Sequence, residues 1–180
     1  MEIRASGSPW QCLGWAILQC VLFVLVLPLG TALCLNLSPL LTLALISSTL
    51  VIEYGAAPVG IALGLPPAFV LFVIVIVALG VILLLFALFE ILGESSVRIA
   101  RFLKNARTRV TASPFLTKYG IYGVVPGVII LGIYVCPPVS WVLGWRRDHA
   151  IILMMAGYVA VSLFTILIST GIIHLITGEY

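Results

Sequence analysis

The hydrophobic residues of the chain fall into five blocks whose lengths predict different roles. The blocks cover approximately residues 12–35, 37–65, 66–92, 119–145 and 149–176. A helix needs about 20 consecutive apolar residues to cross the hydrocarbon core of a bilayer. The first, third and fifth blocks are long and have few polar interruptions, so each predicts one transmembrane helix.

The second and fourth blocks are interrupted by glycine and proline. Two complete spans and a turn would need more than about 40 residues, and neither block is that long. Each block therefore either crosses once or enters and leaves the membrane on the same side. The main interruptions are Glu53, Gly55, Pro58, Gly60 and Gly64 in the second block, and Gly120, Gly123, Pro126, Gly127, Gly132, Pro137 and Pro138 in the fourth.

The basic residues favour turning back for both blocks. Residues 93–118 carry six of the nine basic residues, and cytoplasmic loops beside spans are rich in Lys and Arg. If this loop is cytoplasmic and both blocks turn back, Arg4, Arg146 and Arg147 are cytoplasmic too. We therefore expect three transmembrane helices and two re-entrant hairpins, which enter from opposite sides of the membrane. Four or five simple spans are the alternative.

A short internal repeat points to the same architecture. Residues 54–64, "YGAAPVGIALG", and 134–144, "YVCPPVSWVLG", share five of eleven residues at a constant offset of 80. Each segment precedes a long apolar block. Inverted repeats with Gly/Pro-interrupted segments at corresponding positions point to transport sites. Chance similarity between two apolar segments that contain Gly and Pro is the alternative.

These observations predict the organisation of the whole chain. We expect one membrane domain over residues 1–180, with a first hairpin-plus-helix repeat at 38–92 and a second, inverted one at 119–176. A basic cytoplasmic loop at 93–118 joins the repeats. The protein is then a multi-pass protein of the cell membrane, with its N-terminus in the cytoplasm.

The composition sets the class of protein and limits its chemistry. The chain is 63% hydrophobic and only 8% charged, and its mean hydropathy is +1.30, which indicates an all-α integral membrane protein. The four cysteines lie in or beside apolar blocks without paired spacing, so we expect buried thiols. No phosphate-binding loop, catalytic triad or metal-ligand cluster is evident. We therefore expect no enzyme activity, no cofactor and no metal, and nucleic-acid binding has little support.

The candidate site lies where the two broken blocks are interrupted. Glu53 is the only acidic residue well inside an apolar block, and such a group is costly unless it is paired or protonated, which suits proton coupling. A carboxyl that is merely hydrated at the mouth of the hairpin is the alternative. Pro58 and Pro138 suit the first turn of a helix, so we expect the returning arms to start there.

The ends of those arms predict a site for an anion. Helix N-termini carry free N–H groups and partial positive charge, which favour a phosphate or a similar group. Tyr54 and Tyr134 are able to donate to a substrate oxygen, although packing is an equal alternative. Arg146 and Arg147 are candidates for lipid-headgroup contact, or serve mainly to set the topology. The predicted substrate or ion pathway comprises Glu53, Tyr54, Pro58, Tyr134, Pro137 and Pro138.

Three segments resemble a known family. They are "IEYGAAPVGIALGLPPAF" at 52–69, "KYGIYGVV" at 118–125 and "SWVLGWRRDHAIILMMAGYVAVSLFTILIS" at 140–169. They are similar to the small multidrug export proteins, whose first signature has the pattern E-x-R-G-A-x-P-x-G-I-x-x-G. This chain departs from the pattern, because Tyr54 and Gly55 follow Glu53 directly and no Arg is present. That family is regarded as a distant relative of the DedA and SNARE-associated (VTT) membrane proteins.

The resemblance implies both a fold and a function. The DedA-like fold has two re-entrant hairpins, each packed against a following helix. The implied activity is small-molecule export, or translocation of an anionic lipid or polyprenyl phosphate. Together with Glu53, it favours a proton-coupled transporter that works as a homo-oligomer or within a membrane complex. The alternative is a structural or accessory subunit of a larger membrane complex.

Overall fold

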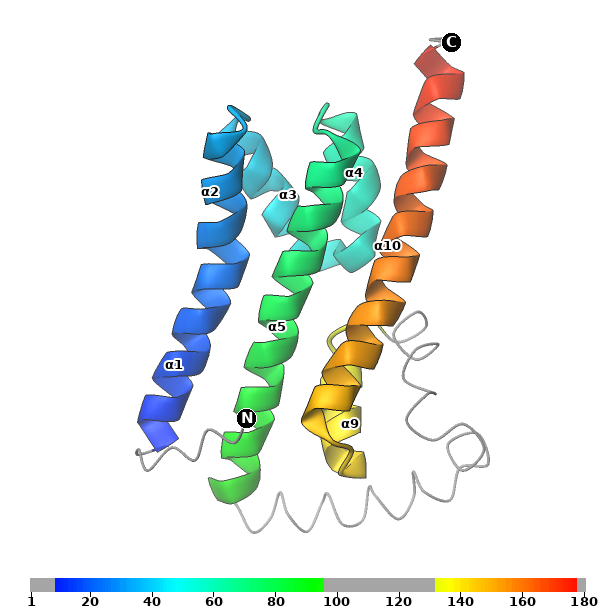
Figure 1. Ribbon diagram of the computed structural model, residues 1–180. Coiled ribbons are helices and arrows are strands. Elements are labelled where there is room, and N and C mark those ends of the chain that lie inside the picture. The colour runs from blue at the N-terminus through cyan, green and yellow to red at the C-terminus, as the bar shows by residue number, and fades with distance from the viewer. Residues whose placement is uncertain (1–8, 96–131, 178–180) are drawn as a thin grey trace, which may run out of the picture.

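The computed structural model describes residues 9–95 and 132–177, and within them the regular secondary structure is helical (Figure 1). Three stretches are long and apolar enough to cross a membrane: Leu13–Cys34, Pro67–Ile91 and Arg147–Gly171. Within these described residues, the predicted three membrane-spanning helices are confirmed by their length and apolar composition. Most of the predicted basic loop at 93–118 and the first arm of the second hairpin lie outside the described residues.

The first long helix runs through α1 (Pro9–Val21), the π-helical turn η1 (Leu22–Val26) and α2 (Leu27–Cys34). Pro28 has no N–H and would collide with the carbonyl four residues earlier in a regular α-helix. The π turn widens the backbone just before this proline, where the Leu27 N–H bonds to the carbonyl of Leu22. The helix therefore continues to the end of the apolar block.

The second block forms two short helices joined by a tight turn. They are α3 (Pro39–Ile52) and α4 (Ala56–Ala62), with the 3₁₀ turn η2 (Glu53–Gly55) between them. At about 1.5 Å per residue neither helix spans the roughly 30 Å hydrocarbon core. α3 runs inward from the end of α2, and α4 returns to that same end, where the long helix α5 (Pro67–Ser95) begins (Figure 1).

α5 is the central element of the fold. It packs against the first long helix, α3, α4, the short helix α9 (Cys136–Leu143) and the long helix α10 (Arg147–Thr177). Val70, Val73 and Ile74 of α5 are fully buried. Gly80 allows a close crossing with η1, since a Cβ there would lie 2.9 Å from the Cβ of Phe23.

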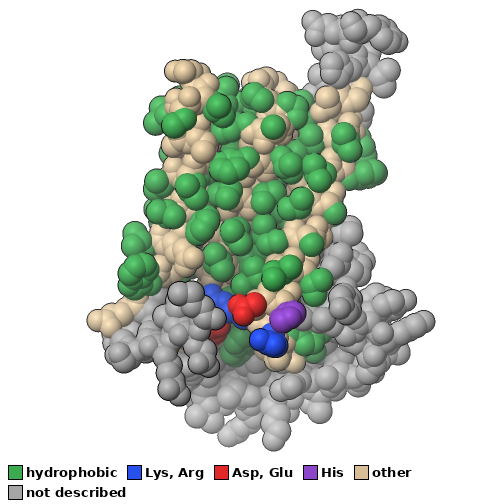
Figure 2. Space-filling model, viewed as in Figure 1, with side chains coloured by type: hydrophobic (Ala, Val, Ile, Leu, Met, Phe, Trp, Pro, Cys, Tyr) green, Lys and Arg blue, Asp and Glu red, His purple; other side chains and the backbone are tan. Residues whose placement is uncertain are grey.

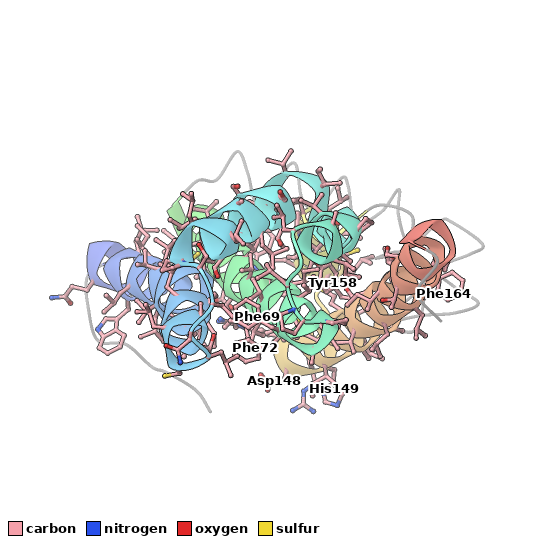
Figure 3. All side chains as sticks on the ribbon, turned by 90° about the horizontal axis from the view of Figure 1, so that it is seen from above. Phe69, Phe72, Asp148, His149, Tyr158 and Phe164 are labelled. Atoms are coloured by element: carbon pink, nitrogen blue, oxygen red, sulfur yellow. The ribbon has the colours of Figure 1, made fainter. Side chains whose placement is uncertain are left out.

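Many of the apolar side chains lie on the outer surface, and on the face shown in Figure 2 the charged side chains gather at one end. Glu53 lies elsewhere, in the turn η2. Trp15 of α1 and Leu167 of α10 are 75% and 71% exposed. α10 shows the contrast between its faces, because Tyr158 lies among the helices while Phe164 lies on the outer side (Figure 3). Such a surface is suited to lipid rather than water, which agrees with an integral membrane protein.

The two segments related by the offset of 80 have the same backbone. α4 begins at residue 56 and α9 at 136, and α5 begins at 67 and α10 at 147. Gly64 and Gly144 both adopt left-handed conformations, with φ of 76° and 69°. The turn hydrogen bonds also match: Leu65 N–H to Gly60 O and Trp145 N–H to Ser140 O are both 3.2 Å long. α5 and α10 run in opposite directions through the bundle (Figure 1).

One prediction about these segments was wrong. The returning helices begin at Ala56 and Cys136, two residues before Pro58 and Pro138. The first four N–H groups of a helix have no partner within it, so proline is tolerated at the third helical position as well as the first. In α9 the N–H of Val139, directly after the two prolines, bonds to the carbonyl of Val135.

Candidate functional site

The turn between α3 and α4 is built around a strained residue. Glu53 has φ 57° and ψ −128°, a conformation that residues other than glycine rarely adopt. Such a residue costs about 1–3 kcal/mol and persists only where its surroundings hold it. The Glu53 N–H still bonds to the carbonyl of Thr49, so the strain lies in the reversal of the chain rather than in a lost hydrogen bond.

The carboxylate of Glu53 reaches the segment just before α9. Its Oε2 accepts a hydrogen bond of 3.0 Å from the backbone N–H of Ile133. The neighbouring Gly132 has φ 78°, and a Cβ there would lie 2.6 and 2.7 Å from the two carboxylate oxygens. Glycine at 132 thus provides both the left-handed conformation and the space for the carboxylate.

Tyr134 makes a second link between the same segments. Its hydroxyl donates a hydrogen bond to the backbone carbonyl of Leu50. Leu50 lies in the last turn of α3, where the carbonyl groups lack partners within the helix. We call this meeting of residues 50–55 with residues 132–136 the junction.

The junction brings together part of the predicted site. Glu53 and Tyr134, two of the residues assigned to the pathway from the sequence, belong to it. Pro58 lies in α4, while Pro137 and Pro138 lie in the first turn of α9, so these prolines shape the helices that leave the junction. The backbone of Tyr54 forms part of η2, but its side chain lies outside what the structure describes.

Glu53 has no basic partner within the described part of the chain. The ion pair found there joins Glu90 to Arg147 at one end of α5, and no described basic side chain reaches the junction. The partner of the carboxylate is a backbone dipole, Ile133 N–H.

Arg147 is held by contacts that the sequence did not reveal. Its Nη1 lies 2.9 Å and 3.1 Å from the two carboxylate oxygens of Glu90, and its guanidinium lies 5.9 Å from the centre of the Phe86 ring. The side chains of Arg147 and Glu90 are 40% and 45% exposed, so the pair is partly hydrated. Arg146 is exposed, and its proposed headgroup contact stays a prediction.

Other places in the described residues offer less chemistry. Within 9–95 and 132–177 no cluster of His, Cys, Asp and Glu side chains is placed to hold a metal ion. An apolar cavity of about 430 Å³ lies between the end of α2 and the start of α5, and no junction residue lines it. It is bounded by Thr31, Leu35, Leu37, Pro66, Ala68, Phe69 and Phe72.

Sequence reasoning missed Gly132 and Ile133 as partners of Glu53. Ile133 acts through its backbone N–H, which has no signature in the residue type. The usable signal was the offset of 80, because Ile133 corresponds to Glu53 itself. Gly132 was visible only as one of several glycines in the fourth block.

Comparison with known proteins places the chain in a family. No curated protein and no solved structure matches it. Residues 53–164 match the model of a family described as "Putative small multi-drug export protein". The match begins at Glu53 and includes Gly132, Ile133 and Tyr134, so it covers most of the junction. Because it spans more than half of the chain, the resemblance seen in the sequence is confirmed, and the chain belongs to this small multi-drug export protein family.

Proposed function

We propose that the protein is a small proton-coupled membrane transporter whose two re-entrant hairpins meet at the junction. One observation carries the proposal: the carboxylate of Glu53, at the turn of the first broken block, is bonded to backbone of the second. Ionisable groups inside a membrane are costly and mark ion or substrate pathways. The family name, which refers to drug export, supports transport as the general activity.

Three features support the proposal of two re-entrant hairpins related by an inverted repeat. α3, α4 and α9 are too short to cross a bilayer. Helix starts and left-handed glycines recur at an offset of 80. α5 and α10 run in opposite directions, as an inverted repeat requires (Figure 1). We place the end of the bundle that carries Arg146 and Arg147 in the cytoplasm, by the distribution of basic residues.

The junction supplies a mechanism for proton coupling. Ile133 N–H lies three residues before the start of α9, where the helix dipole favours negative charge. In the structure Glu53 provides that charge. When Glu53 takes up a proton, its hydrogen bond weakens and the donor is released to another acceptor. An anionic substrate oxygen and a proton would therefore be taken up together, because the substrate replaces the carboxylate on the same donor.

The substrate class follows from this competition and from the DedA-like resemblance. We propose an anionic amphiphile, either a phospholipid or a polyprenyl phosphate. Among the residues that the structure describes, no basic side chain lies at the junction to neutralise a second negative charge. A phosphate oxygen would accordingly bind there only after Glu53 has become neutral. We propose a homo-oligomer, because a single bundle of this size has few helices with which to enclose a substrate pathway.

Reconstitution in liposomes tests the proposal. Fluorescent phosphatidylglycerol and a fluorescent polyprenyl phosphate are followed as they cross the bilayer, with and without a pH gradient. The wild type should accelerate crossing in response to the gradient. Glu53→Gln should lose the response to pH, since an amide cannot exchange the proton, while the control Asp148→Asn should keep it.

Three outcomes would overturn all or part of the proposal. A Glu53→Gln variant that responds to the gradient like the wild type would remove Glu53 from coupling. Absence of any lipid crossing, together with fixed partner proteins on purification, would favour the accessory-subunit alternative. Gradient-driven movement of organic cations instead of anionic lipids would support transport but exclude the proposed substrate class.

A further inference from the structure

Three side-chain contacts tie α5 to the second repeat at a single end of the bundle. Glu90 accepts two hydrogen bonds from Arg147, Arg147 lies over Phe86, and Phe89 packs on Trp141 with ring centroids 6.0 Å apart. We call these contacts the α5–α10 clamp. They join the last turns of α5 to the start of α10 and to α9, near the end where the charged side chains gather (Figure 2).

Among the described residues, the opposite end of the bundle has no equivalent of the clamp. At an offset of 80, Glu90 corresponds to Thr170, Phe89 to Ser169 and Arg147 to Pro67. The hydroxyls of Thr170 and Ser169 bond to carbonyls of their own helix, at 2.9 and 2.7 Å. Pro67 has no group to offer. The backbone repeats, but the polar link between the long helices exists at one end.

We infer that the α5–α10 clamp is a gate, and that the structure shows the state closed at the clamp end. The inference rests on the proposed function, because a gate has meaning only in an alternating-access protein. In an inverted repeat, opening at one end accompanies closing at the other. A link present at one end alone therefore sets which state is favoured at rest.

The chemistry of the clamp suits a gate that opens reversibly. Both charged side chains are about two-fifths exposed, so either can be rehydrated when the pair separates. Exposed pairs contribute little, whereas a deeply buried pair would be too costly to break. The Arg147–Phe86 and Phe89–Trp141 contacts add modest attraction without a further charge.

Distance measurements between spin labels test the gate directly. One label pair is placed at the clamp end, on Leu88 of α5 and Ile152 of α10, and a second at the opposite end, on Ala68 and Leu167. All four side chains are exposed, and the native cysteines are replaced beforehand. The wild type should show mainly the short distance at the clamp end.

Breaking the pair should shift the populations. Arg147→Gln and Glu90→Gln should each raise the ratio of open to closed molecules at the clamp end by about threefold to tenfold. The second label pair should move toward shorter distances in the same samples. The exchange of both residues, Glu90→Arg with Arg147→Glu, should restore the closed distance. Asp148→Asn, a charge change on the next residue, should leave both distributions unchanged.

The two ends separate a gate from local fraying. A longer distance at the clamp end, with no change at the opposite end, would mean that the helix ends merely loosen, and this would overturn the inference. Unchanged distances in both single variants would overturn it as well. Lipid crossing is measured separately on the same variants, so a protein that opens at the clamp end without moving lipid would refute the proposed substrate and not the clamp.

Discussion

The two short-helix units, residues 56–67 and 136–147, have the same backbone and different chemistry. Both begin a helix at the first residue, place a left-handed glycine at the ninth and start a long helix at the twelfth. The first unit begins three residues after Glu53 and carries no charge. The second follows on Ile133, whose backbone N–H serves that carboxylate, and it ends in Arg146 and Arg147.

This difference shows how the same backbone arrangement can carry different chemistry in the two units. Glycine and proline fix where each helix starts and stops, so these positions recur. The residues around them then diverge: an acid precedes the first unit, while a backbone donor precedes the second unit, which has a basic end. Packing has diverged too, since a Cβ at Gly60 would lie 2.8–2.9 Å from Val70 and Leu45, while its counterpart Ser140 holds a side chain and is fully buried.

The largest expected effect comes from removing the glycine that receives the carboxylate. Gly132→Ala should destabilise the protein by about 2–4 kcal/mol, because a left-handed alanine is strained and its Cβ collides with Glu53. Unfolding in mixed micelles by added denaturing detergent measures the loss. Gly64→Ala is the matched control: its φ of 76° is similar and its Cβ would meet nothing within 4 Å, so it should lose only the conformational part.

A double substitution separates collision from strain. In a Glu53→Ala background the carboxylate is gone, so Gly132→Ala should cost no more than Gly64→Ala does. The two effects are then strongly non-additive, as expected for residues in contact. Simple additivity would show that the carboxylate does not lie against Gly132.

The next effect concerns the hydrogen bond of Glu53. Glu53→Ala should cost about 1–3 kcal/mol, because the buried Ile133 N–H loses its acceptor. Glu53→Gln keeps an acceptor oxygen and should retain most of the stability. The strained backbone is common to both variants, so their difference isolates the hydrogen bond. Equal stability of the two variants would indicate that Ile133 N–H finds water or another acceptor.

Much of the fold was predictable, because apolar length and Gly/Pro positions are local properties. The three spans followed from uninterrupted hydrophobic runs. Glu53 and Tyr134 were candidate site residues because they lie in the two interrupted blocks. The Glu90–Arg147 pair was not predictable, since its partners are separated by 57 residues and each looked like an ordinary end-of-helix charge. The π turn before Pro28 was also missed, because the hydrophobic run continues unchanged through it.

A smaller effect tests whether the two equivalent glycines also contribute equally to stability. Gly64→Ala and Gly144→Ala should each cost about 1–2 kcal/mol, because φ is 76° and 69° at the two positions. The same micelle unfolding experiment applies to both. Similar losses support equivalent helix ends in the two units. A loss of stability at one position only would mean that the two equivalent helix ends contribute differently to the free energy of unfolding.

The smallest predicted effect is the loss of one hydroxyl at the junction. Tyr134→Phe removes the hydrogen bond to Leu50 and keeps the ring, so it should cost about 0.5–1.5 kcal/mol. Hydrogen exchange followed by mass spectrometry should show faster exchange in the peptide that covers the end of α3. Because Tyr134 and Glu53 join the same two segments, Tyr134→Phe should cost less in a Glu53→Ala background than in the wild type. Independent costs would mean that the two links act separately, and residues 50–55 and 132–136 would then meet at two places instead of one junction.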